Sequence, residues 1–179
     1  MESSPVIMKG NYPYFINPLT DGVPSMDPEL LSEVTDWVVK AGNFSDCSLI
    51  VAPESMGIPL AVPVSLRLGI PYTVVRKKSY GLPGETAFEQ RTGYSENRMY
   101  INGVKSGDRV VILDDVISTG GTVVSLILAL RRIGAEVADV LIPVDKNEGR
   151  NTVLRDTGIA VKSLVEVTVS DGKVKCRLC

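Results

Sequence analysis

The chain has 179 residues, of which 44% are hydrophobic and 22% are charged, so it can build one ordinary globular domain without a disulfide or metal staple. Its formal net charge of −2 at pH 7 excludes the strongly basic face typical of proteins that bind nucleic acid or anionic membranes. The chain contains no histidine, which removes imidazole from acid–base catalysis and from most transition-metal sites.

Targeting signals and cysteine motifs are also missing from the sequence. No apolar run approaches the roughly 20 residues needed to span a bilayer, and Met1 to Gly10 lacks the basic and apolar regions of a signal peptide. Cys47, Cys176 and Cys179 are too scattered for a disulfide framework or a zinc motif. We therefore expect a cytoplasmic protein with reduced thiols.

The first part of the chain predicts an irregular lobe followed by a helix. Residues 12–25 are rich in Pro, Gly and Asn and predict a folded loop lobe. Asp27 can cap a helix and Pro28 suits its first position, and the apolar residues that follow share one helical face. Gly42 is expected to end this helix.

Strands and helices then alternate along the chain. Short apolar runs predict buried strands at residues 49–52, 72–75, 110–113, 137–144, 161–169 and 173–178. Periodic segments predict helices at residues 59–68, 123–133 and 151–156. This alternation predicts an α/β fold with a mainly parallel sheet flanked by helices, in which ligands bind at the carboxyl ends of the strands. The polar, Gly-rich residues 76–98 show no period and predict a mobile lid over that edge.

The most informative segment follows the predicted strand 110–113. Asp114 and Asp115 come first, and three hydroxyl residues and two glycines then open a helix. Converging backbone N–H groups, the helix N-terminus and the hydroxyls together predict a cradle for a phosphate. The carboxylates cannot bind phosphate, so they need vicinal hydroxyls or a divalent cation. A ligand with a terminal phosphate and a ribose diol satisfies both halves. The cradle consists of Ser118, Thr119, Gly120, Gly121 and Thr122.

Two common nucleotide-binding motifs do not fit this segment. No lysine follows the glycines, as a Walker loop requires, and the three-glycine spacing of a dinucleotide fingerprint is missing. The segment instead resembles the phosphoribosyl pyrophosphate signature of type I phosphoribosyltransferases, two acids followed by Thr-Gly-Gly-Thr. The order of the other elements is similar to the purine branch of that family, particularly to small archaeal hypoxanthine/guanine enzymes.

The resemblance covers about residues 50–175 and implies both a fold and a set of roles. It implies one phosphoribosyltransferase domain over residues 1–179, with a small N-terminal hood contributed by about residues 1–26 and by the C-terminal part. Asp114 and Asp115 would act in catalysis by holding the ribose hydroxyls and steadying the positive sugar. The cradle would bind the 5-phosphate of the substrate.

The resemblance also implies a pyrophosphate site on two neighbouring loops. The first loop, where the family often carries a non-proline cis peptide, consists of Glu54, Ser55, Met56 and Gly57. Adenine enzymes typically have arginine in place of Met56, so the match to them is weaker. Cations at the end of the next strand would neutralise the charge that develops on the leaving group. These cations are Arg76, Lys77 and Lys78.

The base site is expected between Lys146 and the hood. A lysine at the matching place faces the exocyclic oxygen of 6-oxopurines in similar enzymes, and an ammonium group, which only donates, pairs with a C6 carbonyl and disfavours the amino group of adenine. The hood residues Phe15, Ile16 and Asn17 would lie at the base, where an aromatic or aliphatic wall would stack on the purine, with core filling as the alternative interpretation. In the lid, Tyr94 is the expected catalytic residue.

One catalytic position departs from the pattern of the adenine enzymes. The place of their lid glutamate is occupied by Gly93. Three other glutamates lie in the lid, and the sequence does not discriminate among Glu85, Glu89 and Glu96.

The implied reaction is purine salvage. A purine nitrogen displaces pyrophosphate from C1 of phosphoribosyl pyrophosphate without an enzyme nucleophile, and Mg²⁺ enters with the substrate rather than on protein side chains. Hypoxanthine and guanine are the expected bases, a homodimer is the expected assembly, and neither nucleic acid nor membrane is an expected partner. Adenine or xanthine phosphoribosyltransferases remain alternatives. A non-catalytic regulator that senses phosphoribosyl pyrophosphate is a further alternative, disfavoured because the chain lacks a basic face.

Overall fold

A parallel sheet forms the centre of the computed structural model, which describes residues 1–10, 12–91, 96–146, 149–170 and 172–179. Within these residues its strand order is β11-β9-β7-β3-β4, and each neighbouring pair is parallel. These strands are β3 (Leu49–Pro53), β4 (Tyr72–Val75), β7 (Arg109–Leu113), β9 (Glu136–Leu141) and β11 (Val161–Lys162).

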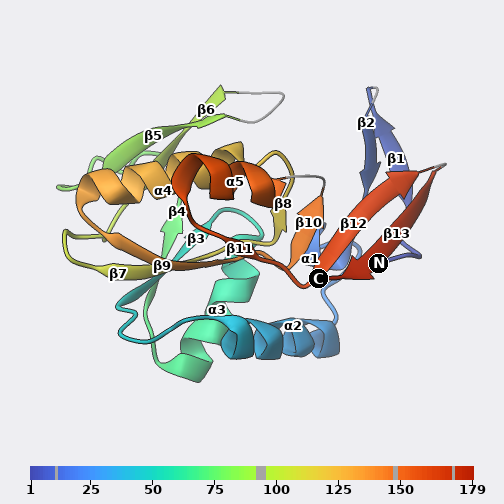
Figure 1. Ribbon diagram of the computed structural model, residues 1–179, viewed down its shortest axis with the longest axis horizontal. Helices are drawn as coiled ribbons and strands as arrows, with labels where there is room; N and C mark the ends of the chain where they lie inside the picture. Colours follow the sequence, from blue (N-terminus) through green and yellow to red (C-terminus); the bar gives the residue numbers. More distant parts are fainter. Residues whose placement is uncertain (11, 92–95, 147–148, 171) are drawn as a thin grey trace.

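Helices cover both faces of this sheet, as predicted (Figure 1). α2 (Pro28–Ala41) and α3 (Gly57–Leu68) pack on one face, and α4 (Gly121–Ile133) and α5 (Gly149–Thr157) on the other. Successive strand residues face opposite sides, so each strand supplies both layers of the core. Val51 and Ile112 pack with the α4 side, whereas Ile50, Val111 and Leu113 pack with the α2 and α3 side. The mainly parallel α/β fold is confirmed.

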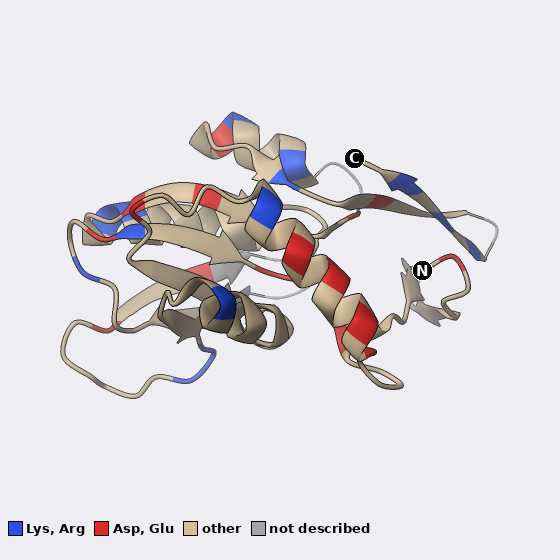
Figure 2. Cartoon of the chain, turned by 90° about the horizontal axis from the view of Figure 1, so that it is seen from below, with Lys and Arg blue, Asp and Glu red and all other residues tan. Residues whose placement is uncertain are grey.

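The predicted boundaries of α2 are confirmed by its capping contacts. The Asp27 side chain accepts hydrogen bonds from the Glu29 N–H (2.7 Å) and the Leu30 N–H (3.3 Å). Pro28 occupies the first helical turn, and Gly42 follows the last helical residue. The red bands along this helix in Figure 2 mark its acidic residues. No described helix is long and apolar enough to cross a membrane.

A second group of strands stands at one end of the molecule (Figure 1). The parallel β8 (Val116–Ile117), β10 (Val144–Lys146) and β12 (Val165–Ser170) pair in that spatial order, and β13 (Lys173–Leu178) adds antiparallel to β12. Beside them stand the antiparallel β1 (Val6–Lys9) and β2 (Tyr12–Phe15), followed by α1 (Pro18–Asp21). We call β1, β2 and α1 the hood.

Three predictions about these strands were wrong. Residues 161–169 were expected to form one strand, but they divide into β11 of the central sheet and β12 of the second group. Residues 12–15 were expected to be irregular but form β2, because their backbone pairs with β1. Residues 137–144 were expected to form one strand, but the chain leaves the central sheet at Ile142 and Pro143. The Pro143 carbonyl accepts from the N–H groups of Leu164 and Val165, both at 2.9 Å, and proline itself has no N–H to continue a ladder.

The predicted lid is also more regular than expected. β5 (Thr86–Arg91) and β6 (Glu96–Ile101) form an antiparallel hairpin in which Phe88 pairs with Met99. These two side chains are 5% and 1% exposed and belong to the core shared with α4. An interior face of this kind stabilises the hairpin. The sequence does not reveal this face, because a long, mostly polar stretch separates Phe88 from Met99. Tyr94, the expected catalytic residue, lies outside the described residues.

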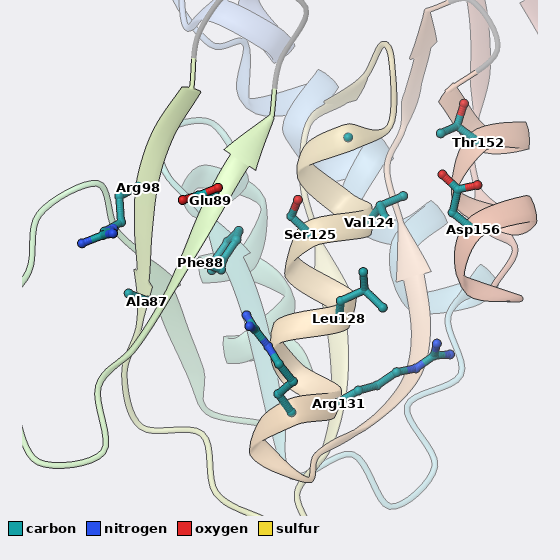
Figure 3. Close-up of a pocket in the computed structure, with 12 residues that line it drawn as sticks. Ala87, Phe88, Glu89, Arg98, Val124, Ser125, Leu128, Arg131, Thr152 and Asp156 are labelled. Atoms are coloured by element: carbon teal, nitrogen blue, oxygen red, sulfur yellow. The ribbon is translucent and has the colours of Figure 1, made fainter.

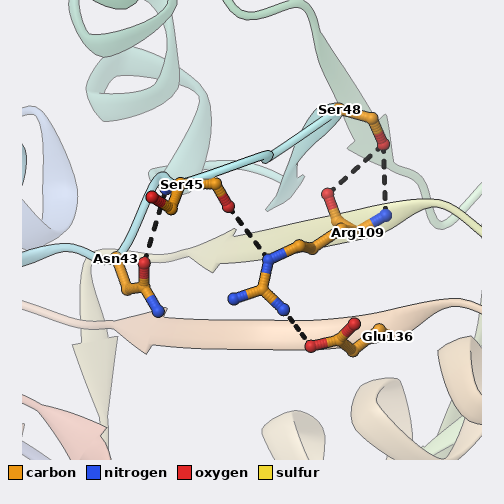
Figure 4. Close-up of polar contacts among 5 residues, drawn as sticks. All are labelled: Asn43, Ser45, Ser48, Arg109 and Glu136. Carbon is orange, nitrogen blue, oxygen red and sulfur yellow. Dashed lines mark hydrogen bonds and ion pairs between the residues drawn. The ribbon is translucent and has the colours of Figure 1, made fainter.

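The edge of the sheet at the amino ends of its strands is held by polar contacts (Figure 4). Arg109, at the start of β7, donates from Nε to the Ser45 carbonyl (2.9 Å) and forms an ion pair with Glu136 on β9. The Ser48 N–H donates to the Arg109 carbonyl (2.8 Å). These contacts fix the edge opposite the loops that follow β3, β4 and β7.

Candidate active site

The two carboxylates lie where β7 ends at the carboxyl edge of the sheet. Asp114 and Asp115 connect β7 to the short strand β8, and the Asp115 N–H donates to Asp114 Oδ1 (3.0 Å). Asp115 is 7% exposed and Asp114 is half-buried. The structure therefore brings the predicted acidic pair into one buried position directly before the predicted phosphate cradle.

Both carboxylates are disfavoured in their ionised form. Burial raises the pKa of Asp114 to about 6. Burial also raises the pKa of Asp115 well above its usual range, and the negative charge of Asp114 adds to this effect. Among the described residues neither carboxylate forms a salt bridge, so a bound cation or hydroxyl donors would relieve the cost of ionising them. This donor set fits a magnesium ion that takes its remaining ligands from a substrate.

The phosphate cradle is a close-packed backbone loop. Gly120 has φ +81°, in the left-handed region that favours glycine, and α4 begins at the next residue. A Cβ on Gly120 would lie 2.6 Å from the carbonyl oxygen of Gly149, at the start of α5. A Cβ on Gly149 would lie 2.4 Å from the Ser118 carbonyl oxygen. The cradle is thus shaped by α5, a contact that the sequence analysis missed.

The side chains of the cradle agree with a role in ligand binding. Thr119 is exposed, and Ser118 and Thr122 are half-buried, so hydroxyl groups remain near the surface of the loop. The N-terminus of the 13-residue helix α4 adds partial positive charge at the same place. The 5-phosphate role of residues 118–122 is compatible with this geometry.

The predicted pyrophosphate loop contacts the acidic pair. The peptide bond between Glu54 and Ser55 is cis, a feature that the family often carries in this loop and that the sequence alone left open. Gly57 begins α3, and a Cβ there would lie 2.9 Å from the Leu113 carbonyl oxygen and 3.2 Å from Asp114 Oδ1. Only glycine allows the two loops to approach so closely.

The side chains of Glu54 and Met56 contact neighbouring segments, whereas Ser55 is exposed. Glu54 accepts from the Lys77 N–H (2.9 Å) and forms an ion pair with Arg76 (3.2 Å), joining the ends of β3 and β4. The Met56 Cε atom would lie 3.5 Å from a Cβ on Gly22, so its side chain reaches the hood. Lys77 and Lys78 remain exposed. Met56 can therefore offer a pyrophosphate its backbone but not its side chain.

The residues of the predicted base site lie where β10 meets the hood. Lys146 is 7% exposed, and its ammonium group lies 3.9 Å from the ring centroid of Phe15 and 4.8 Å from that of Tyr14. Phe15 is 1% exposed, so its ring fills the core instead of forming an open wall. Asn17 is 4% exposed, and its Oδ1 accepts from the Leu19 N–H (2.9 Å) as the cap of α1. Direct base contact by Phe15 and Asn17 is not supported, whereas Ile16 is half-buried and stays a candidate.

The lid glutamates differ in their surroundings. Glu85 accepts hydrogen bonds from the Ser79 hydroxyl, the Tyr80 N–H (2.9 Å) and the Asn102 amide (2.9 Å). The Ser79 contact, followed by the other two, lowers the pKa of Glu85 to about 2. Glu85 therefore anchors its own loop, and Glu89 is exposed on β5. The side chain of Glu96 lies outside the described residues.

A separate cavity of about 1090 Å³ lies along the flank of α4, between the β5–β6 hairpin and α5 (Figure 3). Leu128 and Ser125 of α4 face it together with Phe88 of β5. Gly121 is the one residue of the predicted cradle in its lining. The cavity therefore does not coincide with the carboxylates or with Lys146.

Comparisons with known proteins agree with this geometry. The model of the phosphoribosyl transferase domain matches residues 33–164. The chain belongs to this family. It is 50% identical to the hypoxanthine/guanine phosphoribosyltransferase of Methanothermus fervidus over 98% of this chain and 93% of that protein. It is 53% identical to the protein of the same name from Methanothermobacter thermautotrophicus, over 98% and 90%.

Solved structures of phosphoribosyltransferases share the fold. The adenine phosphoribosyltransferase of Thermoanaerobacter pseudethanolicus superposes with a TM-score of 0.73 at 25% identity, covering 91% of this chain and 95% of that one. The enzyme of Giardia lamblia in complex with 9-deazaadenine gives a TM-score of 0.74 at 19% identity, over 93% and 95%. The α/β phosphoribosyltransferase fold predicted from the sequence is therefore confirmed.

Proposed function

We propose that this phosphoribosyltransferase transfers the phosphoribosyl group of phosphoribosyl pyrophosphate to hypoxanthine or guanine. The products are IMP or GMP and pyrophosphate. The observation that carries the choice of base is the buried ammonium group of Lys146 at the edge of the hood. A buried ammonium only donates hydrogen bonds, so it suits the C6 carbonyl of a 6-oxopurine and leaves the C6 amino group of adenine without an acceptor. The names of the archaeal relatives support the same choice.

In the proposed complex the chain holds phosphoribosyl pyrophosphate at three points. Asp114 and Asp115 accept hydrogen bonds from the ribose hydroxyls, residues 118–122 bind the 5-phosphate, and residues 54–57 offer backbone N–H groups to the pyrophosphate. Arg76 and Lys77 lie where negative charge grows as the C1–oxygen bond breaks. A purine nitrogen forms the new bond to C1, and the enzyme supplies positioning and charge stabilisation.

Magnesium is the proposed cofactor. It would neutralise pyrophosphate and ribose oxygens, and the paired carboxylates at residues 114 and 115 are the protein groups that fit it. Within the described part of the chain no cluster of three or more acidic, cysteine or histidine side chains could hold a metal. The ion would therefore arrive with the substrate.

A comparison of bases tests the proposed substrate. With phosphoribosyl pyrophosphate and Mg²⁺, we expect kcat/KM for hypoxanthine and guanine to exceed that for adenine by at least about 100-fold, because the wrong base leaves a buried polar group unpaired. Nucleotide formation with hypoxanthine, guanine, xanthine and adenine is measured separately. Lys146→Met should lower the rate with hypoxanthine and leave the slow rate with adenine unchanged.

Other outcomes of this comparison support the rival functions. A preference for adenine would overturn the role of Lys146, and a preference for xanthine would move the assignment within the family. Binding of phosphoribosyl pyrophosphate without turnover of any base would favour a regulator.

We also propose a homodimer that uses the outer face of α3. Val62 and Leu66 lie one helical turn apart on this face and are 37% and 81% exposed. Exposed apolar residues on one face are typical of subunit interfaces. Sedimentation equilibrium should give twice the chain mass for the wild type and the chain mass for Leu66→Asp. A monomeric wild type at micromolar concentration would contradict the proposal.

A further inference from the structure

Asp21, the last residue of α1, accepts hydrogen bonds from three groups of the hood. Its donors are the Tyr14 hydroxyl, the Asn17 N–H (3.0 Å) and the Thr20 hydroxyl (2.8 Å). Burial opposes ionisation of Asp21, but the hydrogen bonds, Tyr14 first, and the positive charge of Lys146 outweigh it and lower its pKa. Asp21 is thus a carboxylate at neutral pH, partly buried at the hood.

The charge of Asp21 acts on two groups of the proposed active site. It attracts the ammonium group of Lys146, which lies over the rings of Tyr14 and Phe15. It also contributes to the raised pKa of Asp115, after burial and the effects of Asp114. The charge of Asp21 therefore influences both Lys146, the proposed base contact, and Asp115, a proposed ribose contact. Asp21 and Asp115 lie 94 positions apart in the sequence.

Direct contact of Asp21 with a purine is disfavoured. A carboxylate has about four lone-pair sites, and three donors of the hood already occupy the oxygens of Asp21. The side chain can instead act through its neighbours. One neighbour is the Tyr14 hydroxyl. The other is the ammonium group of Lys146, whose position determines which group at C6 of the purine it can bind.

We propose that Asp21 is a positioning residue for the base subsite, which orients Lys146 and the Tyr14 ring toward a 6-oxopurine. This inference rests on the proposed function. Without the carboxylate, the Lys146 ammonium loses an electrostatic partner in the hood, and the Tyr14 hydroxyl loses its charged acceptor. The base would then meet a less ordered donor, while the loops that bind the sugar and the phosphates keep their contacts.

The test is Asp21→Asn, which keeps the shape of the side chain and removes its charge. We expect the KM for hypoxanthine to rise about tenfold, as the loss of one charge-assisted interaction predicts, while the KM for phosphoribosyl pyrophosphate changes less than about twofold. Asp27→Asn removes the charge of another helix-associated carboxylate, at the exposed cap of α2, and should leave both KM values unchanged.

A double-mutant cycle separates positioning from a purely structural role. In a Lys146→Met background, Asp21→Asn should raise the KM for hypoxanthine by a smaller factor than it does in the wild type, because the part of its effect that passes through the lysine is already lost. Equal rises in both KM values, a fall in melting temperature alone, or additive effects in the double variant would overturn the inference.

The wild type distinguishes this inference from the function on which it rests. If the wild type forms no nucleotide from hypoxanthine or guanine, both fail. If it does so and Asp21→Asn has normal KM values, the positioning role alone fails.

Discussion

Replacing Asp115 with asparagine should lower kcat/KM for phosphoribosyl pyrophosphate by about 100- to 1000-fold, the loss typical of removing one preorganised electrostatic contact. The amide cannot hold a ribose diol or a cation with a full negative charge, and it adds an N–H₂ donor at a place where the substrate also donates. Steady-state rates with saturating hypoxanthine and varied phosphoribosyl pyrophosphate measure the effect. Wild-type rates would reject the role of Asp115.

The same substitution should not weaken the fold. Because the pKa of Asp115 is raised in the folded state, the folded protein binds more protons than the unfolded chain above pH 3.8. Its contribution to stability therefore decreases as pH rises from 3.8 through the folded pKa. Asparagine removes this penalty, so the melting temperature at pH 7.5 should stay equal or rise. Asp108→Asn, on the opposite edge of the sheet, is the matched control and should change neither activity nor metal dependence.

The pH dependence of the wild type gives an independent check. The pKa of Asp114 is about 6 in the free protein, and its ionised form is the one that accepts substrate hydroxyls or a cation. The kcat/KM for phosphoribosyl pyrophosphate should therefore fall about tenfold per pH unit below about pH 6. A profile that stays flat down to pH 5 would contradict a required Asp114 carboxylate.

Replacing Gly149 with alanine should raise the KM for phosphoribosyl pyrophosphate by about 10- to 100-fold. The added Cβ would lie 2.4 Å from the Ser118 carbonyl oxygen and 2.7 Å from the Ile117 side chain. Backbone cannot yield as a flexible side chain does, so the phosphate cradle must shift, and small displacements of a positioned substrate have large effects on rate. Initial rates at varied phosphoribosyl pyrophosphate provide the measurement.

The control for this steric effect lies in the same helix. Asn151 is exposed two residues further along α5, so Asn151→Ala adds no clash and should leave KM unchanged. If Gly149→Ala binds phosphoribosyl pyrophosphate as tightly as the wild type, the contact between α5 and the cradle has no role in binding.

Local chemistry predicts the part of the candidate site that lies in one continuous segment of the sequence. Residues 114–122 carry carboxylates, glycines and hydroxyls in one segment between a strand and a helix, so local chemistry alone locates them. The sequence analysis did not identify Asp21 and Gly149, because the residues that they contact or influence lie far away in the sequence. A lone aspartate in a loop and a lone glycine before a helix have many ordinary explanations, and only the fold brings them to Lys146 and Ser118.

The errors of the sequence analysis also have physical causes. Pro13 and the glycines around β2 suggest a loop, but an edge hairpin tolerates proline where no ladder N–H is needed. Phe15 was expected either at the base or in the core, and its burial favours the core, because a large ring gains free energy when it leaves water. Tertiary packing decided both cases.

The short strand β8 has a consequence for the size of the ligand. β8 has two residues, Val116 and Ile117, which separate the acidic pair from the cradle, and they pair directly with Val144 and Asp145 of β10. This pairing fixes Lys146 relative to both ends of residues 114–122, the proposed sugar-binding segment. The pairing of the two strands would therefore set the distance between the bound base and the bound phosphate. An inserted residue in either strand would change this distance while leaving every chemical group in place.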